Sequence, residues 1–255
     1  MKTNFCLIAL LALTMNLAAQ SPYPEENEEY AYFKEVKFAG QKPGITDFVT
    51  SYIGDEPEDE LTGLLYTMWQ KYLKNKPMDT NEKVTVDARN GFVCFEKTYP
   101  ADSDGLDGGR NNIEMCYWNC SDGNHKIFAV SVAQYHNGRA IQTEFGGITF
   151  GIYNNSTHKI FYNNGVSLGI DDIKTGMENL SCGVKDGDFY VENIVTGERK
   201  SITEEEYDKW WENYPVITFN LPRTGKDITA VINNLREGKK EVLIKWNGLK
   251  FEVQQ

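Results

Sequence analysis

The chain has few histidines and lacks the patterns on which many metal and nucleophile enzymes depend. Its 255 residues include three histidines, His125, His136 and His158, and none of them forms a His-x-x-x-His or His-Glu-x-x-His pair. A zinc hydrolase is therefore disfavoured. There is also no Gly-x-Ser-x-Gly segment for a serine nucleophile and no glycine-rich phosphate loop between a strand and a helix, which disfavours elbow-type hydrolases and nucleotide enzymes.

The chain has fewer basic than acidic residues. The chain has 26 Lys and Arg residues against 37 Asp and Glu residues, which gives a formal net charge of −11. An acidic chain is poorly suited to non-specific binding of nucleic acid or of an anionic membrane surface. The simplest consequence of this charge is solubility, and no nucleic-acid partner is expected.

A long apolar run is missing as well. The run from Cys6 to Leu17 is short and is interrupted by Thr14 and Asn16, so it does not suit a membrane span. Lys2 before the run and small residues at its end are typical of a secretory signal peptide. We therefore expect residues 1–19 to be removed, the protein to be periplasmic or extracellular, and no transmembrane segment to remain.

Four cysteines would remain after cleavage, namely Cys94, Cys116, Cys120 and Cys182. An even number in an exported chain permits two disulfides in three connectivities. Cys116 and Cys120 lie on one expected strand roughly 13 Å apart, which is too far for a bridge. A Cys94–Cys116 disulfide is the favoured pairing, and buried free thiols are the alternative.

Turn signals are abundant and decide the fold class. Four Asn-Gly and four Asp-Gly dipeptides separate short apolar runs, which predicts an α+β fold of mostly antiparallel meander and hairpins with two main helices packed on the sheet. The stretch 112–164 is the centre of this sheet. A two-residue turn at Asn137-Gly138 would place Val132 opposite Thr143, and the apolar residues on both faces of 127–135 predict a central strand covered on both sides.

The same rule predicts further hairpins. Asn90-Gly91 would pair Val86 with Phe95, and Asn247-Gly248 would pair Ile244 with Phe251. Helices are expected at 57–74, which carries an apolar stripe, and at 204–214, which follows a Thr203/Glu206 capping box. Near residue 168 the sequence becomes richer in Gly and Asp and poorer in alternating apolar residues. This change in composition divides the chain into 20–168 and 169–255, or the two parts are continuous as one domain.

One loop has the composition of a cation site. Asp102, Asp104 and Asp107 lie among glycines, and Ca²⁺ prefers carboxylate oxygens on a backbone that can wrap around it. The loop departs from the EF-hand pattern at Leu106, where a third ligand would stand. A solvated surface loop is therefore the competing interpretation, and Ca²⁺ is the cofactor that the loop would suit.

Aromatic residues make up 13% of the chain and supply candidate binding groups. An exposed aromatic patch is unusual without a function, although most tryptophans fill cores. The candidates for ligand binding are Trp118, Trp210, Trp211 and Trp246. A carboxylate pair for hydrolysis would come from Glu114, Glu144 and Asp171.

These observations favour an exported envelope protein that binds a glycan or an envelope protein without catalysis. The alternative is a carboxylate-dependent hydrolase acting on an extracellular polymer, and the second alternative is a structural envelope protein or an inhibitor. The Ala19-Gln20 junction and the segment Trp246-Asn247-Gly248-x-x-Phe251 resemble features of exported proteins from Bacteroidetes-type bacteria. This resemblance covers a small part of the chain and implies no activity.

Overall fold

The computed structural model describes residues 32–57, 59–100, 108–141, 146–162, 180–185, 187–193, 196–213, 216–234 and 238–254. The expected signal peptide, the expected boundary near residue 168 and the acidic loop with Asp102, Asp104 and Asp107 lie outside these ranges. No helix in the described ranges is long and apolar enough to cross a membrane.

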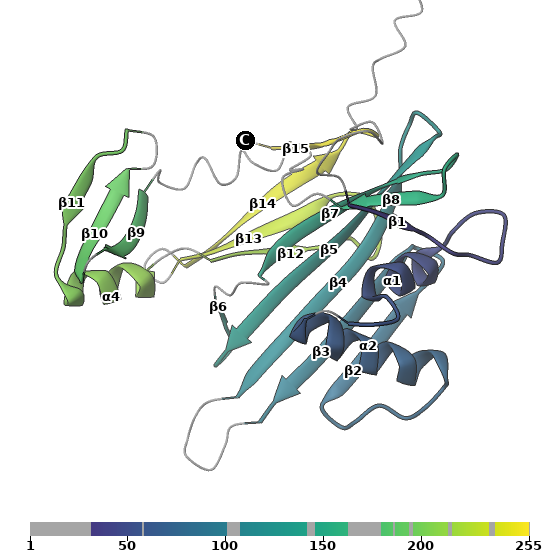
Figure 1. The fold of residues 1–255 in the computed structure, drawn as a ribbon, viewed down its shortest axis with the longest axis horizontal. Helices are drawn as coiled ribbons and strands as arrows, with labels where there is room; N and C mark the ends of the chain where they lie inside the picture. Colours follow the sequence, from purple (N-terminus) through teal and green to yellow (C-terminus); the bar gives the residue numbers. More distant parts are fainter. Residues whose placement is uncertain are drawn as a thin grey trace, which may run out of the picture.

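The main sheet has eight strands, and every pairing in it is antiparallel. Its order is β1-β8-β7-β5-β4-β3-β2, with β6 paired to β5 (Figure 1). The strands are β1 (Tyr32–Glu35), β2 (Glu82–Asp87), β3 (Phe92–Tyr99), β4 (Gly109–Asn119), β5 (His125–His136), β6 (Arg139–Ile141), β7 (Gly147–Asn154) and β8 (Lys159–Tyr162). The expected class, mostly antiparallel sheet in an α+β fold, is confirmed.

Strand β5 lies in the middle of this sheet and is buried on both faces. Ile127 and Ala129 belong to one hydrophobic cluster, and Phe128 and Val130 belong to the other. Side chains alternate between the two faces of a strand, so each cluster takes every second residue. The prediction of a central strand covered on both sides is confirmed.

Two helices cover one face of the main sheet (Figure 1), α1 (Ile45–Ile53) and α2 (Glu60–Leu73). Phe48 of α1 and Trp69 of α2 are fully buried against it. Helix α1 was not predicted, because its β-branched residues have low helix propensity. Its buried face, rather than its intrinsic propensity, explains the helix.

The detail of two main helices packed on the sheet is not confirmed. Helix α2 begins at Glu60, not at Pro57, because the Asp59 carboxylate accepts the Thr62 backbone N–H at 2.6 Å and caps the helix. The other expected helix is α4 (Glu204–Asn213), preceded by the predicted capping box of Thr203 and Glu206. It contacts β10 of a separate small sheet.

That small sheet has the order β11-β10-β9. Its strands are β9 (Leu180–Lys185), β10 (Asp188–Asn193) and β11 (Arg199–Ser201). The Tyr207 ring of α4 packs on Phe189 of β10 at 4.8 Å between ring centroids. This unit is therefore a three-stranded sheet with one helix on it.

A third sheet covers the other face of the main sheet, with the order β12-β13-β14-β15. Its strands are β12 (Val216–Asn220), β13 (Ile228–Asn234), β14 (Gly238–Trp246) and β15 (Phe251–Val253). Ser131 Oγ donates to the Phe219 carbonyl at 2.6 Å, and Trp118 Nε1 donates to the Lys226 carbonyl at 2.8 Å. Strands β12 to β15 therefore share a core with the main sheet.

The hairpin registers differ from those expected. At Asn137-Gly138 the turn is tight and pairs His136 with Arg139, but Val132 pairs with Gly147 of β7, not with Thr143. Strand β6 ends at Ile141, and the pairing with β5 resumes at Gly147 of β7, four residues beyond the expected Thr143. The prediction of Val132 opposite Thr143 was therefore wrong.

The other two Asn-Gly hairpins are each shifted by two residues. Strand β2 pairs Val84, not Val86, with Phe95, and β14 pairs Ile244 with Val253, not with Phe251. In the last hairpin the side-chain Oδ1 of Asn247 accepts the backbone N–H groups of Leu249 and Lys250, both at 3.0 Å. This side-chain turn lengthens the loop to four residues. A shift of two keeps every side chain on its expected face.

The shared core predicts a large effect of Phe251→Ala. Phe251 is 1% exposed and packs on Phe150 and Trp118 at centroid distances of 5.5 and 5.1 Å. The substitution should lower the free energy of unfolding by about 3 to 5 kcal/mol, measured by urea denaturation. Exposed Lys250→Ala is the control. Two separate transitions, only one of them shifted, would show that the sheets unfold independently.

Candidate functional site

A change from apolar to polar side chains marks the end of the helix-covered core. On this face of β3, β4 and β5, one cross-strand row is buried and apolar: Phe95, Ile113 and Val132. The next row toward the ends of β3 and β5 is polar: Lys97, Asn111 and Gln134. Tyr99 and Gly109 pair in the row after that. The core therefore gives way to a row of hydrogen-bonding groups on the same sheet face.

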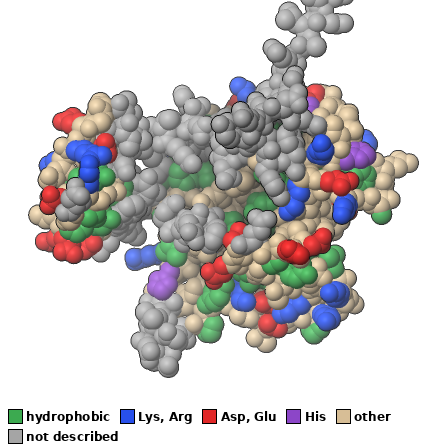
Figure 2. Space-filling model, in the orientation of Figure 1, with side chains coloured by type: hydrophobic (Ala, Val, Ile, Leu, Met, Phe, Trp, Pro, Cys, Tyr) green, Lys and Arg blue, Asp and Glu red, His purple; other side chains and the backbone are tan. Residues whose placement is uncertain are grey.

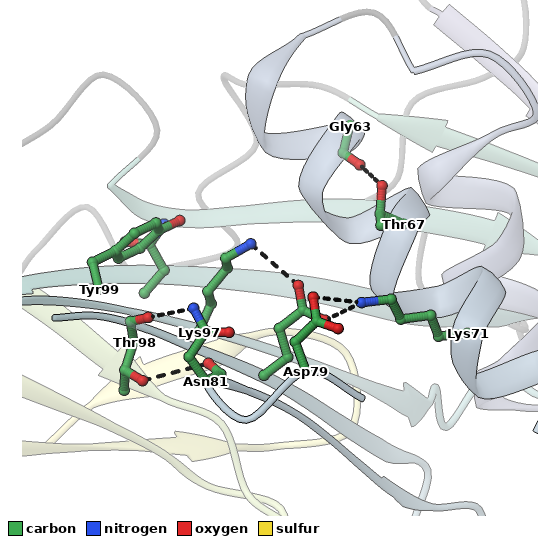
Figure 3. Close-up of polar contacts among 10 residues, drawn as sticks. Gly63, Thr67, Lys71, Asp79, Asn81, Lys97, Thr98 and Tyr99 are labelled. Atoms are coloured by element: carbon green, nitrogen blue, oxygen red, sulfur yellow. Dashed lines mark hydrogen bonds and ion pairs between the residues drawn. The ribbon is translucent and has the colours of Figure 1, made fainter. Parts of the chain in front are cut away.

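These residues form one wall of a groove of about 450 Å³ whose other wall is α2. The sheet contributes Lys97, Tyr99, Asn111 and Gln134. The helix contributes Glu60, Leu61, Gly63, Leu64 and Thr67, which recur at the spacing of one helix face. Figure 3 shows Lys97 and Tyr99 projecting from the sheet and Gly63 and Thr67 on the neighbouring helix.

Tyr99 presents an aromatic ring to this groove. It is 41% exposed, and its hydroxyl accepts the Asn111 side-chain N–H at 3.3 Å. A Cβ atom built on Gly109 would lie 3.7 Å from the ring, so the ring rests against the backbone of the next strand. Tyr99 is therefore held in place while part of its ring remains open to solvent.

A buried carboxylate holds the lysines beside the groove. Glu82 Oε1 lies 3.1 Å from Lys97 Nζ, and Glu82 Oε2 lies 2.7 Å from Lys71 Nζ. Lys71 also pairs with Asp79 at 2.9 Å (Figure 3). Burial by itself would raise the pKa of Glu82, but the hydrogen bonds from Lys71 and Lys97 hold it below its ordinary value. The Lys97 ammonium is thus already neutralised.

Gly63 leaves open space in the groove wall. A glycine inside a helix costs about 1 kcal/mol relative to alanine, and a Cβ atom built here would meet no atom within 4 Å. Neither packing nor a left-handed backbone requires this glycine. One turn later, the Thr67 hydroxyl donates to the Gly63 carbonyl at 3.1 Å. The missing side chain lets the groove reach the helix backbone.

The structure places the candidate tryptophans elsewhere. Trp118 is 4% exposed in the core, where its indole N–H is already bonded to Lys226. Trp246 is partly buried and packs on Phe251, and Trp210 is half-buried on α4. The Trp211 side chain lies outside the described part of the chain. None of the described tryptophans lines the groove.

The groove residues themselves were not predicted. One signal existed in the sequence: Lys97 and Tyr99 continue the strand phase of Val93 and Phe95, so a polar residue follows on the face that had been apolar. That signal indicates where a core ends. It does not indicate that α2 lies beside the same position.

The sequence also suggested a metal site and a pair of carboxylates for hydrolysis. The described residues contain no group of three His, Cys, Asp or Glu side chains that could hold a metal. The Asp102, Asp104 and Asp107 loop lies outside the described ranges, so Ca²⁺ binding there stays a prediction. Glu60 is the one carboxylate among the described residues that line the groove.

Glu114 lies on the opposite face of β4, where it joins two sheets. Its carboxylate accepts the Leu221 backbone N–H at 2.7 Å and the Asn112 side-chain N–H at 3.2 Å. Burial raises the pKa of this carboxyl. The other two carboxylates considered for hydrolysis, Glu144 and Asp171, lie outside the described residues.

All four described cysteines are free thiols, and all are buried. Cys94 pairs in register with Glu114, whereas Cys116 pairs with Phe92. The two cysteines are therefore diagonal neighbours, and such residues lie about 7–8 Å apart, beyond the usual reach of a disulfide. The expected Cys94–Cys116 bridge does not fit this register. Burial raises the pKa of both thiols to about 12.

Comparison of the chain with known protein families, with curated proteins and with solved structures gave no match. Among the described residues, the groove is therefore the feature whose chemistry indicates a function. Its elements are an exposed tyrosine, two side-chain amides and a wall opened by a glycine.

The Glu82 cluster predicts a pH-dependent contribution to stability. Because the pKa of Glu82 in the fold lies below its ordinary value, its carboxylate stabilises the fold above that value, and the contribution is lost as pH falls through the folded pKa. Glu82→Gln should lower the urea midpoint at pH 7, with the difference from wild type vanishing in acid. Glu96→Gln, which breaks the more exposed pair with Lys83, is the control. An undiminished difference in acid would contradict the ion-pair explanation.

The buried thiols predict slow reaction with thiol reagents. Thiolates react and thiols do not, so folded residues 20–255 should react slowly with a chromogenic disulfide reagent at pH 8. Denaturant without a reductant should release all four thiols quickly. A count of two in denaturant would show that a disulfide forms.

Proposed function

We propose that this chain is an exported bacterial envelope protein that binds a glycan without catalysing a reaction. The observation that carries the proposal is the groove in which the exposed Tyr99 ring lies beside the amides of Asn111 and Gln134. The sugar face would pack on the ring, and the sugar hydroxyls would bond to the amides.

The size and composition of the groove support this class of ligand. Ligand sites are typically concave, with volumes of about 300–1,000 Å³. Their walls are mainly apolar and carry a few polar groups that orient the ligand. Here Leu61 and Leu64 supply apolar surface, while the sheet row supplies the polar groups. Tyr also offers a large contact area at low entropic cost.

A binding role is favoured over hydrolysis. Glycoside hydrolysis generally needs two carboxylates across the bond that is cut, and Glu60 is the single carboxylate among the described groove residues. Glu114 has the raised pKa expected of an acid. Its oxygens, however, are bonded on the other face of the sheet. A hydrolase remains the alternative proposal, and a structural protein or inhibitor is the third.

Export is part of the same proposal. It rests on the signal-like pattern of residues 1–19 and agrees with the state of the cysteines, since buried protonated thiols resist oxidation. The acidic chain also agrees with a soluble envelope protein. Localisation of a tagged full-length chain by cell fractionation would test it.

Loss of the Tyr99 ring should abolish glycan binding. We expect Tyr99→Ala to weaken binding of the best oligosaccharide from a glycan array at least tenfold, because the stacking surface is lost. Isothermal titration calorimetry measures the change. Tyr72→Ala is the matched control, since Tyr72 is 38% exposed and lies outside the groove. Equal affinities of the two variants would refute the groove as the site.

A further inference from the structure

We propose that the groove selects an uncharged N-acetylated sugar, recognised through its acetamido group. This inference rests on the proposed function and specifies the ligand class of the same groove. It is carried by the unused hydrogen-bonding groups of the sheet row and by the apolar wall opposite them.

The charges around the groove argue for an uncharged ligand. Lys97 is the one cation in the described groove lining, and it is paired with Glu82. Figure 2 shows acidic and basic side chains interspersed over the face formed by α1 and α2, without a patch of one sign. An acidic glycan would have to compete with Glu82 for Lys97, in a chain whose net charge is −11.

Two side-chain amides retain complementary free groups. Asn111 donates an N–H to the Tyr99 hydroxyl, which leaves its carbonyl oxygen as an acceptor. The Gln134 side chain is half-buried, and its amide makes no hydrogen bond to another described residue, so its N–H groups are available as donors. An acetamido group carries one N–H donor and one carbonyl acceptor, which match these two residues.

The wall formed by α2 suits the methyl group of the acetamido substituent. Leu61 and Leu64 present apolar surface on the wall that faces the amides, where a methyl group gains by leaving water. The space beside Gly63 is open and admits the extra atoms that distinguish an acetamido group from a hydroxyl. A ligand with a hydroxyl at this position would bond to one amide and leave the apolar wall uncovered.

Three oligosaccharides that differ only at the second ring carbon test the inference. They are β-1,4-linked glucose oligomers with a hydroxyl there, the N-acetylated amino-sugar oligomers and the de-acetylated oligomers with an ammonium group. Affinities for residues 20–255 are measured by titration calorimetry at one chain length. We expect the N-acetylated oligomer to bind about tenfold more tightly than the hydroxyl form, the worth of one extra hydrogen bond with methyl burial.

Gln134→Leu separates recognition from folding. It retains the size of the side chain and removes its amide, so the preference for the N-acetylated oligomer over the hydroxyl form should fall to near unity. Gln70→Leu is the matched control, because Gln70 is also half-buried but lies on α2 outside the groove. Thermal unfolding of both variants confirms that they are folded.

The outcomes separate the two proposals. Preference for the acetamido form that Gln134→Leu abolishes and Gln70→Leu retains supports the inference. Equal binding of all three oligomers, or preference for the hydroxyl or ammonium form, overturns the inference and leaves glycan binding standing. Failure of all three oligomers, and of a wider glycan array, overturns the proposed function itself and favours a protein partner.

Discussion

Burial of strand β5 on both faces is the constraint on which the structure depends. A strand in the middle of a sheet is shielded by its neighbours at the edges but not on its faces, and β5 carries apolar side chains on both. Helices α1 and α2 cover one face, and the sheet β12–β15 covers the other. The three layers follow from this need, because neither cover alone would remove all the apolar surface from water.

The groove arises where one of these covers ends. The apolar row through Phe95 is beneath the helices, and the row through Lys97 is at their margin. A lysine at this depth needs a counter-charge, which the buried Glu82 supplies from the adjacent strand. The same cluster holds Lys71 of α2. The charge pairing that connects the helix to the sheet therefore also fixes one border of the groove.

Features that depend on residues close together in the sequence could be predicted, whereas features that depend on residues far apart in the sequence could not. The burial of β5 was predictable because the apolar residues of its two faces follow one another in the sequence, and the α4 capping box was predictable because it spans four residues. The registers of the Asn90 and Asn247 hairpins were shifted because their turns are closed by the side chains of Asp87 and Asn247. Helix α1 was missed because packing outweighs the low propensity of its residues. The groove depends on the pairing of three strands and on the position of α2, which no local pattern encodes.

Gly63 lowers the stability of α2 at the place where the proposed binding groove lies. Two other glycines of the described residues have structural reasons: Gly91 adopts a left-handed backbone under the Tyr117 ring, and Gly151 is packed against Ile160. Gly63 has neither reason, yet it weakens α2 in the segment that covers the core. Proteins tolerate such local costs mainly where binding or activity needs them. The open space at this helix position, opposite the amides of Asn111 and Gln134, therefore supports the proposal that α2 forms one wall of a binding site.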